Sequence, residues 1–284
     1  MLSKIWLWAI LLSLLPIFSY AHDQNNSQVL ELYVKSGMQK QVEQLPSVIQ
    51  ALFDQSVPED DQARKLPKEI LSAMRASVPK AFAPERLKET ILAELTGKLT
   101  AQDIKDTLQW LDSPIGRKCT KLEEAASTPE AEAEMQQYAA RLHDSPPTAE
   151  RLKVLRELDS AAKVTGNAVE MAIQTQVAVA LAVNATLPVE QQKPLEDVYS
   201  EIEKTGPAIE ASVRSQTLIS QLWTYRSLTE AEIQLYTEFA KSPAGSKYNS
   251  AAMAALDKAN LQGAAKWGEL IGDAMKELKG KSEA

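Results

Sequence analysis

Residues that could carry catalysis or bind a metal are few in this chain. Its 284 residues include two histidines, His22 and His143, and one cysteine, Cys119. A multi-histidine metal site or a Ser-His-Asp triad therefore lacks candidates. If the chain is cleaved after Ala21, the new amino terminus and the His22 imidazole could chelate copper with His143. A copper site of this kind needs ligands in a fixed geometry, whereas the polar residues after His22 favour disorder. We therefore expect no metal and no cofactor.

Two Ser-x-x-Lys spacings match the serine–lysine pair of some penicillin-binding enzymes. They are Ser77 with Lys80 and Ser160 with Lys163. The companion Ser-Asp-Asn motif is absent from the sequence. A chain rich in Ser and Lys contains about one or two such spacings by chance. We therefore expect a protein that is not an enzyme.

The charge balance bears on the partners of this chain. The formal net charge is −7, and 24% of the residues are charged. Nucleic acids and anionic lipid surfaces attract proteins with clustered Lys and Arg. We therefore expect no nucleic-acid partner. With a single cysteine the chain forms no internal disulfide, so packing of the core must stabilise it.

The N-terminus has the layout of a secretory signal peptide. Residues 1–4 carry one positive charge, residues 5–18 are almost wholly apolar, and small residues lead to Ala21. The apolar run is short for a membrane span, and no basic flank follows it. We expect residues 1–21 to be a signal peptide that is cleaved after Ala21. This predicts a location in the periplasm of a Gram-negative bacterium, with no stable membrane span after cleavage.

The elements that must position any site are helices. Ala, Leu, Glu, Gln and Lys dominate, and no run of alternating β-branched residues lies between turn signals. The fold class is therefore predicted as all-α. Several prolines lie where helices are expected to begin, because the first helical position needs no N–H. These are Pro67, Pro84, Pro114, Pro129 and Pro243.

The clearest break lies at residues 141–148, where Pro146 and Pro147 are adjacent. Two neighbouring prolines cannot lie inside a helix. We place a boundary there, between a first helical unit of residues 22–145 and a second of residues 146–284. Residues 1–21 are assigned to the signal peptide.

Two segments of the chain resemble each other. Residues 99–126, the first motif segment, align without gaps with residues 228–255, the second motif segment. Nine aligned pairs are identical, whereas average residue usage gives about two. We interpret the chain as two tandem related multi-helix units. The identical pairs are Leu99/Leu228, Thr100/Thr229, Ile104/Ile233, Ser113/Ser242, Pro114/Pro243, Gly116/Gly245, Lys118/Lys247, Ala125/Ala254 and Ala126/Ala255.

The repeated residues predict how each helix begins. Thr100 and Thr229 are expected N-caps, and Asp103 and Glu232 at the third helical position complete two capping boxes. In each segment a leucine before the cap can pack on an isoleucine one turn into the helix. These pairs are Leu99 with Ile104 and Leu228 with Ile233.

A second helix is predicted to begin directly after the first in each segment. Ser113 and Ser242 are the expected N-caps, and Pro114 and Pro243 follow at the first helical position. Two helices should therefore meet at a tight corner in each unit.

The complete motif is Leu-Thr, an acidic residue with Ile, an aromatic residue and Ser-Pro-x-Gly-x-Lys. It resembles the core motif of a bacterial exported helical family, domain of unknown function 2059. The resemblance implies an exported helical protein, and this family brings no established activity or catalytic residues. After the aromatic residue the chain has Leu111 and Ala240, where the family often has Tyr. The residues are Leu99, Thr100, Asp103, Ile104, Trp110, Ser113, Pro114, Gly116 and Lys118, and Leu228, Thr229, Glu232, Ile233, Phe239, Ser242, Pro243, Gly245 and Lys247.

The Ser-Pro-x-Gly corner could bind a small anion, because a helix N-terminus presents free N–H groups and Lys118 or Lys247 lies nearby. In the alternative, Gly116 and Gly245 permit close packing and the lysines are solvated. We favour the alternative, since the N-cap serine already occupies a donor that an anion would need.

Residues 167–184 form the most apolar predicted helix, and Val169, Met171, Ile173 and Val177 lie in it. Such a helix could line a site for a lipid. A helix that is apolar on most sides is ordinarily buried, so we favour a core helix of the second unit. Cys119 aligns with Tyr248, which indicates a packing position and no reactive thiol.

Two functional hypotheses follow from these features. The first is a non-enzymatic binding or scaffolding module of the cell envelope, with an unknown envelope protein as partner. It depends on the repeated units, the export signal and the scarcity of catalytic residues. The alternative is a carrier or chaperone for an apolar ligand such as a lipid, held near residues 169–183.

Overall fold

A computed structural model describes residues 16–56, 68–187 and 189–282. In these ranges the chain forms twelve α-helices, one short 3-10 helix and no strand, so the all-α prediction is confirmed. The helices are α1 (Pro16–Lys35), α2 (Met38–Ser56), α3 (Lys68–Ala81), α4 (Pro84–Lys98), α5 (Ala101–Leu111), α6 (Pro114–Ala126), α7 (Pro129–Arg141), α8 (Ala149–Ala162), α9 (Val164–Thr186), α10 (Leu195–Thr224), α11 (Glu230–Lys241) and α12 (Pro243–Ser282), with the 3-10 turn at Val189–Gln191.

Four of the predicted prolines open helices: Pro84 in α4, Pro114 in α6, Pro129 in α7 and Pro243 in α12. Pro67 lies outside the described residues. The proline rule has exceptions here, because three further prolines lie inside helices. They are Pro46 in α2, Pro79 in α3 and Pro207 in α10.

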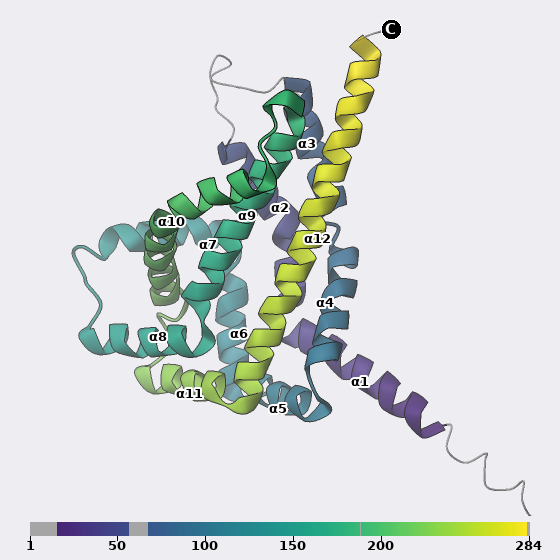
Figure 1. Cartoon of the computed structure of the whole chain (residues 1–284). Coiled ribbons are helices and arrows are strands. Elements are labelled where there is room, and N and C mark those ends of the chain that lie inside the picture. The colour runs from purple at the N-terminus through teal and green to yellow at the C-terminus, as the bar shows by residue number, and fades with distance from the viewer. Residues whose placement is uncertain (1–15, 57–67, 188, 283–284) are drawn as a thin grey trace, which may run out of the picture.

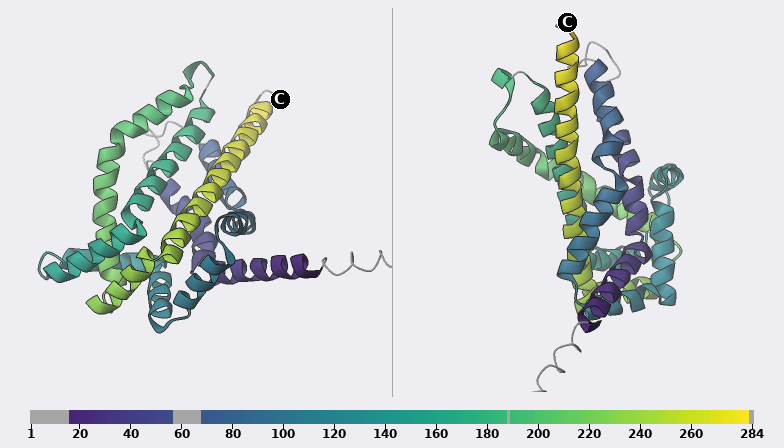
Figure 2. Two further views of the ribbon diagram at one scale, coloured as in Figure 1. Left: turned by 60° about the horizontal axis from the view of Figure 1, so that its bottom comes forward. Right: turned by 90° about the vertical axis from the view of Figure 1, so that its right-hand side faces the viewer.

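The chain reverses direction repeatedly, and one long helix, α12, runs across the other helices (Figures 1 and 2). This helix has 40 residues. It packs against α3, α4 and α5 from the start of the chain and against α9 from the middle. The loop from Leu142 to Thr148 joins α7 to α8 and contains the predicted break.

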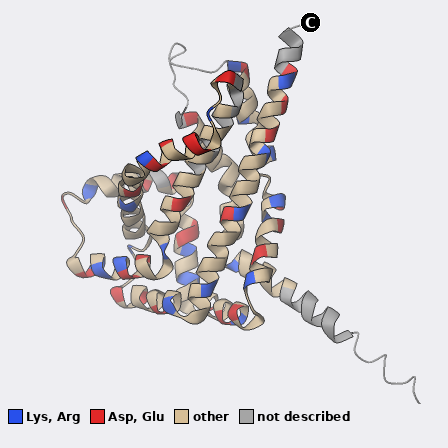
Figure 3. Cartoon of the chain, viewed as in Figure 1, with Lys and Arg blue, Asp and Glu red and all other residues tan. Residues whose placement is uncertain are grey.

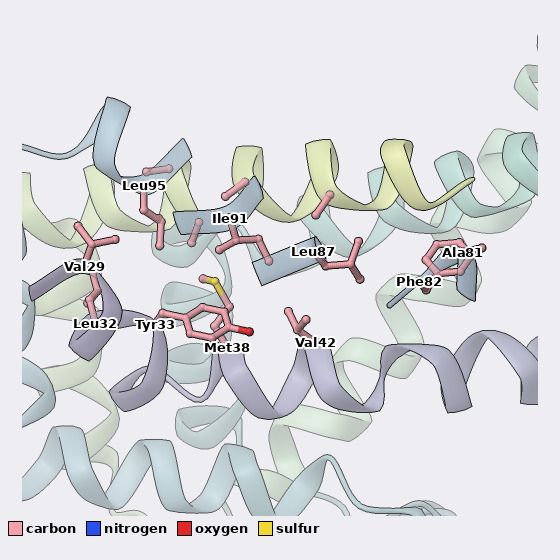
Figure 4. Close-up of a cluster of buried hydrophobic side chains, with 14 of the residues drawn as sticks. Val29, Leu32, Tyr33, Met38, Val42, Ala81, Phe82, Leu87, Ile91 and Leu95 are labelled. Atoms are coloured by element: carbon pink, nitrogen blue, oxygen red, sulfur yellow. The ribbon is translucent and has the colours of Figure 1, made fainter. Parts of the chain in front are cut away.

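The first core lies between α1–α5 and α12. Apolar residues of α1, α2, α3 and α4 face one another in it (Figure 4). The last helix supplies the remaining side. The α12 members of this core are Ala251, Ala252, Ala255, Ala259, Trp267 and Ile271.

The second core lies between α8, α10 and α11, and α6 closes it. From the second motif segment it takes Leu228, Ile233 and Ala240, and from α6 it takes the buried Cys119. Further side chains of α6 and α7 pack at its edge. Each core is thus built mainly from one half of the chain and completed by the last helices of the other half.

The apolar segment 167–184 falls within α9, which packs against α10 and α12. Val177 is buried with Val198 and Ile202 of α10 in a small third cluster, and Ile173 and Leu181 pack at its edge. These contacts favour the core-helix interpretation over a wall for a ligand. Among the described residues, no helix has the length and apolar character that a membrane span requires.

Candidate functional site

The two motif segments fold into equivalent corners. Thr100 caps α5 and Thr229 caps α11, and both capping boxes are present with Asp103 and Glu232. The Ser113 hydroxyl accepts from the Gly116 N–H at 3.0 Å, and the Ser242 hydroxyl accepts from the Gly245 N–H at 3.1 Å. The helix starts predicted from the motif are therefore observed in both segments. The staple residues are buried as well: Leu99, Ile104, Leu228 and Ile233.

The glycine of each corner is required by a close backbone approach. A Cβ atom on Gly116 would lie 2.0 Å from the carbonyl oxygen of Trp110, and one on Gly245 would lie 2.0 Å from that of Phe239. Both distances are far below van der Waals contact. The second helix of each corner can therefore turn directly over the end of the first only with glycine at this position.

The lysine of each motif segment binds the capping-box carboxylate of the other segment. Lys118 Nζ lies 2.7 Å from Glu232 Oε1, and Lys247 Nζ lies 2.5 Å from Asp103 Oδ2. Both lysine side chains stay partly exposed to solvent, at 41% and 46%, and each also pairs with a carboxylate, which was not predicted. Because Asp103 aligns with Glu232 and Lys118 with Lys247, the two ion pairs are reciprocal.

The aromatic residues of the two segments also stack on each other. The rings of Trp110 and Phe239 have centroids 4.7 Å apart and an interplanar angle of 7°. Tyr236 stacks on the same Trp110 at 5.7 Å. Equivalent residues that meet each other, together with reciprocal ion pairs, form the contact pattern of a two-fold interface.

These contacts argue against an anion bound at the Ser-Pro-x-Gly corner. The Gly116 and Gly245 N–H groups are held by the serine caps, and both lysines are engaged by carboxylates. The donors that an anion would use are therefore occupied. The motif residues join two helical corners.

The Asp103 carboxylate makes the interface sensitive to acid. Its pKa is lowered from 3.8 to about 2 by hydrogen bonds from Lys247 and from Thr100. A lowered folded-state pKa stabilises the protein above the unfolded pKa, and this contribution is lost as the pH falls toward about 2. Asp103→Asn should therefore reduce the acid dependence of unfolding in that window. Denaturant titrations of both proteins at a series of acidic pH values test this. An unchanged dependence would contradict it.

A partly buried polar cluster lies beside the interface, where α6 contacts α10 and α11. The Tyr225 hydroxyl donates to Glu123 Oε1 at 2.7 Å, and Tyr236 donates to the same carboxylate. Burial raises the pKa of Glu123, although these two hydrogen bonds lower it in part. Burial also raises the pKa of the neighbouring Cys119 thiol to about 12, so this thiol is not an activated nucleophile.

The raised pKa of Glu123 has a consequence for stability. Because the folded state holds the proton more tightly, stability should fall as the pH rises above the unfolded value near 4.5. Glu123→Gln keeps an acceptor for the tyrosines without the buried charge. We expect a higher melting temperature than wild type at neutral and mildly alkaline pH, with the difference shrinking in acid. A lower melting temperature at every pH would contradict this. Glu134→Gln, on the exposed side of α7, is the matched control.

The two Ser-x-x-Lys spacings considered as catalytic candidates lie in or at the end of helices α3 and α8. Ser77 is buried, and its hydroxyl donates to the Met74 carbonyl oxygen, whereas Lys80 is exposed. Ser160 and Lys163 are both exposed at the end of α8. A Lys-Thr-Gly sequence, the third motif of the same enzymes, occurs at residues 204–206 inside α10, where the threonine hydroxyl donates to a helix carbonyl.

Metal ligands do not gather in the part of the chain that the structure describes. It contains no group of three or more His, Cys, Asp or Glu residues that could hold a metal ion. His143 is exposed in the loop after α7. His22 lies in the first turns of α1.

Sequence comparison supports part of this account. Residues 85–144 match the model of a family described as "Uncharacterized protein conserved in bacteria (DUF2059)". The matched residues run from α4 to the loop after α7 and contain the first motif segment, so the resemblance noted from the motif is confirmed. No curated protein and no solved structure matches the chain.

Proposed function

We propose that this protein is a non-enzymatic binding or scaffolding module of the cell envelope, built from two copies of one helical unit. One observation carries the proposal: the repeated polar residues form helix caps and reciprocal contacts between the two corners. Side chains held in this way position helices and leave no reactive group facing a substrate. The motif therefore serves assembly.

The order of the helices supports a duplicated unit. On this interpretation α1, α2, α5 and the α6–α7 pair correspond to α8, α9, α11 and α12, and the α3–α4 pair corresponds to α10. Pro79 in α3 then aligns with Pro207 in α10, both inside a helix. The buried residues Val29 and Leu32 of α1 align with Leu155 and Leu158 of α8, which are also buried.

Export rests on the sequence of residues 1–21, of which residues 1–15 lie outside the described part. Among the residues whose burial is described, the first buried in the core are Val29 and Leu32 in α1. Cleavage after Ala21 would shorten α1 and leave both residues in place. A mature periplasmic chain that begins at His22 is therefore compatible with this core.

Purification from the native envelope tests the proposal. The full chain and a variant without residues 2–21, which should stay in the cytoplasm, are each isolated gently and measured by native mass spectrometry. We expect the exported chain to begin at His22 and to retain a protein partner that the cytoplasmic variant lacks. A cytoplasmic full-length chain, or turnover lost on one polar substitution, would contradict the proposal. A reproducible mass in the lipid range would favour the carrier alternative instead.

A further inference from the structure

A surface hollow of about 320 Å³ lies between α8 and the end of α11. Five residues line it: Lys153, Arg156, Glu157 and Ser160 of α8, and Lys241 of α11. The two helices pack against each other, and Figure 3 shows basic segments on α8 next to α11. The hollow therefore gathers three cationic side chains and one hydroxyl group around one carboxylate.

The three cations of this hollow have no anionic partner among the described residues, whereas several other lysines of the chain are paired. Lys118 and Lys247 bind carboxylates across the motif interface, and Lys35 bridges Glu31 and Asp112. With the residues that the structure describes, Lys153, Arg156 and Lys241 make no such pair. With Glu157 counted, the local charge is about +2 in a protein whose net charge is −7. Like charges repel at close range, so a bound anion would relieve this arrangement.

The equivalent surface of the first half is built differently. If the halves are copies, as proposed above, Lys241 aligns with Asp112, Arg156 with Leu30 and Ser160 with Val34. In the first half Asp112 is neutralised by Lys35 at 2.7 Å, and Leu30 and Val34 are exposed apolar residues. The basic character is thus specific to the second half, and neither capping nor core packing requires it.

We infer that this hollow is a binding site for a phosphate monoester group. A phosphate monoester carries a charge of about −1.5 to −2 at neutral pH, which matches the local charge of the hollow. The Arg156 guanidinium can donate two parallel hydrogen bonds to phosphate oxygens, and the two ammonium groups and the Ser160 hydroxyl supply further donors. A phosphorylated soluble compound and a lipid headgroup with a terminal phosphate share this chemistry.

Titration of the full mature chain with inorganic phosphate tests the inference. Amide resonances of α8 and α11 are followed at low ionic strength, where screening is weak. We expect saturable shifts confined to the hollow. Lys241→Asp, which installs the residue type of the first half, should weaken binding about tenfold or more, because a charge-assisted contact is replaced by repulsion. Lys153→Ala should weaken it in the same direction with less risk to folding.

Lys105→Asp is the matched control, since it makes the same charge change on the exposed side of α5. It should leave phosphate affinity within about twofold, because screening weakens distant charges. Absence of saturable shifts, or equal loss in Lys105→Asp, would overturn the inference. Vesicles of phosphatidylcholine with and without phosphatidic acid distinguish the sources. Binding only with phosphatidic acid identifies a lipid headgroup, and phosphate binding without vesicle binding identifies a soluble compound. The titration does not depend on the proposed duplication. The phosphate site can therefore be confirmed even if the two halves are not copies of one unit.

Discussion

Gly116→Ala is expected to destabilise the protein by about 3 kcal/mol, at the upper end of what overpacking costs. The added Cβ would lie 2.0 Å from the Trp110 carbonyl oxygen and 3.1 Å from the Leu111 Cα. Both are backbone atoms, so no side chain can move aside. The corner would have to open, which would displace Lys118 and Trp110 from their partners in the second motif segment. Chemical denaturation measured by circular dichroism gives the change in unfolding free energy.

Gly97→Ala is the control for this substitution. Gly97 is exposed near the end of α4, and a Cβ there meets nothing within 4 Å. Alanine restricts the unfolded chain and suits a helix better than glycine, so we expect a gain of about 0.5–1 kcal/mol. Similar effects from the two substitutions would refute the close approach at Gly116. Gly245→Ala should behave like Gly116→Ala, because the Phe239 carbonyl oxygen lies in the equivalent position.

Trp267→Ala is expected to cost about 3–5 kcal/mol, the range for removing a large buried aromatic side chain. Trp267 is 2% exposed, and its Nε1 donates to the Met74 carbonyl oxygen at 3.0 Å. Its ring meets Phe53 and Phe82 edge-on, with centroids 5.9 and 6.2 Å away. These partners belong to α2, to α3 and to the turn after α3, so the substitution removes a main contact between the end of the chain and the first core.

Leu261→Ala on the same helix provides the comparison, because Leu261 is 57% exposed. Its loss should change the unfolding free energy by no more than about 0.5 kcal/mol. Thermal and chemical unfolding of both variants measure the difference. If Trp267→Ala is as mild as Leu261→Ala, α12 does not complete the first core as described.

Local features of this fold could be predicted from the sequence because short-range chemistry determines them. The capping boxes at Thr100 and Thr229 need only residues three positions apart, and the serine caps at Ser113 and Ser242 likewise. Proline explains a further difference between the halves. Pro84 and Pro129 separate α3 from α4 and α6 from α7. If the halves are copies, as proposed above, the equivalent positions are Ser212 and Lys258, and α10 and α12 continue through them.

Contacts between distant segments could not be predicted in the same way. The motif alignment contained the residues of both reciprocal ion pairs, but periodicity does not show which corner faces which. The pairing of Lys118 with Glu232 was not predicted, because the two residues lie far apart in sequence. The pairing of opposite charges at aligned positions was the available signal, and it becomes informative once a two-fold arrangement is considered.

The Glu123 cluster and the basic hollow were harder still to predict from the sequence. Glu123 stands where the second half has Ala252, so the alignment marks a difference without indicating burial or the two tyrosines. Lys153 and Arg156 are separated in sequence from Lys241, and only the packing of α8 on α11 brings them together. The prediction of no nucleic-acid partner was based on the net charge of the whole chain. Net charge averages over local groups of basic residues such as this one.

Cutting the folded chain between its halves tests the account most directly. A protease site inserted in the exposed loop at residues 143–145 is cleaved to completion under native conditions, and the product is analysed by size-exclusion chromatography and thermal unfolding. Because each core takes helices from both sides of this loop, we predict that the two fragments remain together at the size of the uncut protein and unfold in one cooperative transition. Separation into two folded fragments that each keep their helical content would contradict the interlocked arrangement.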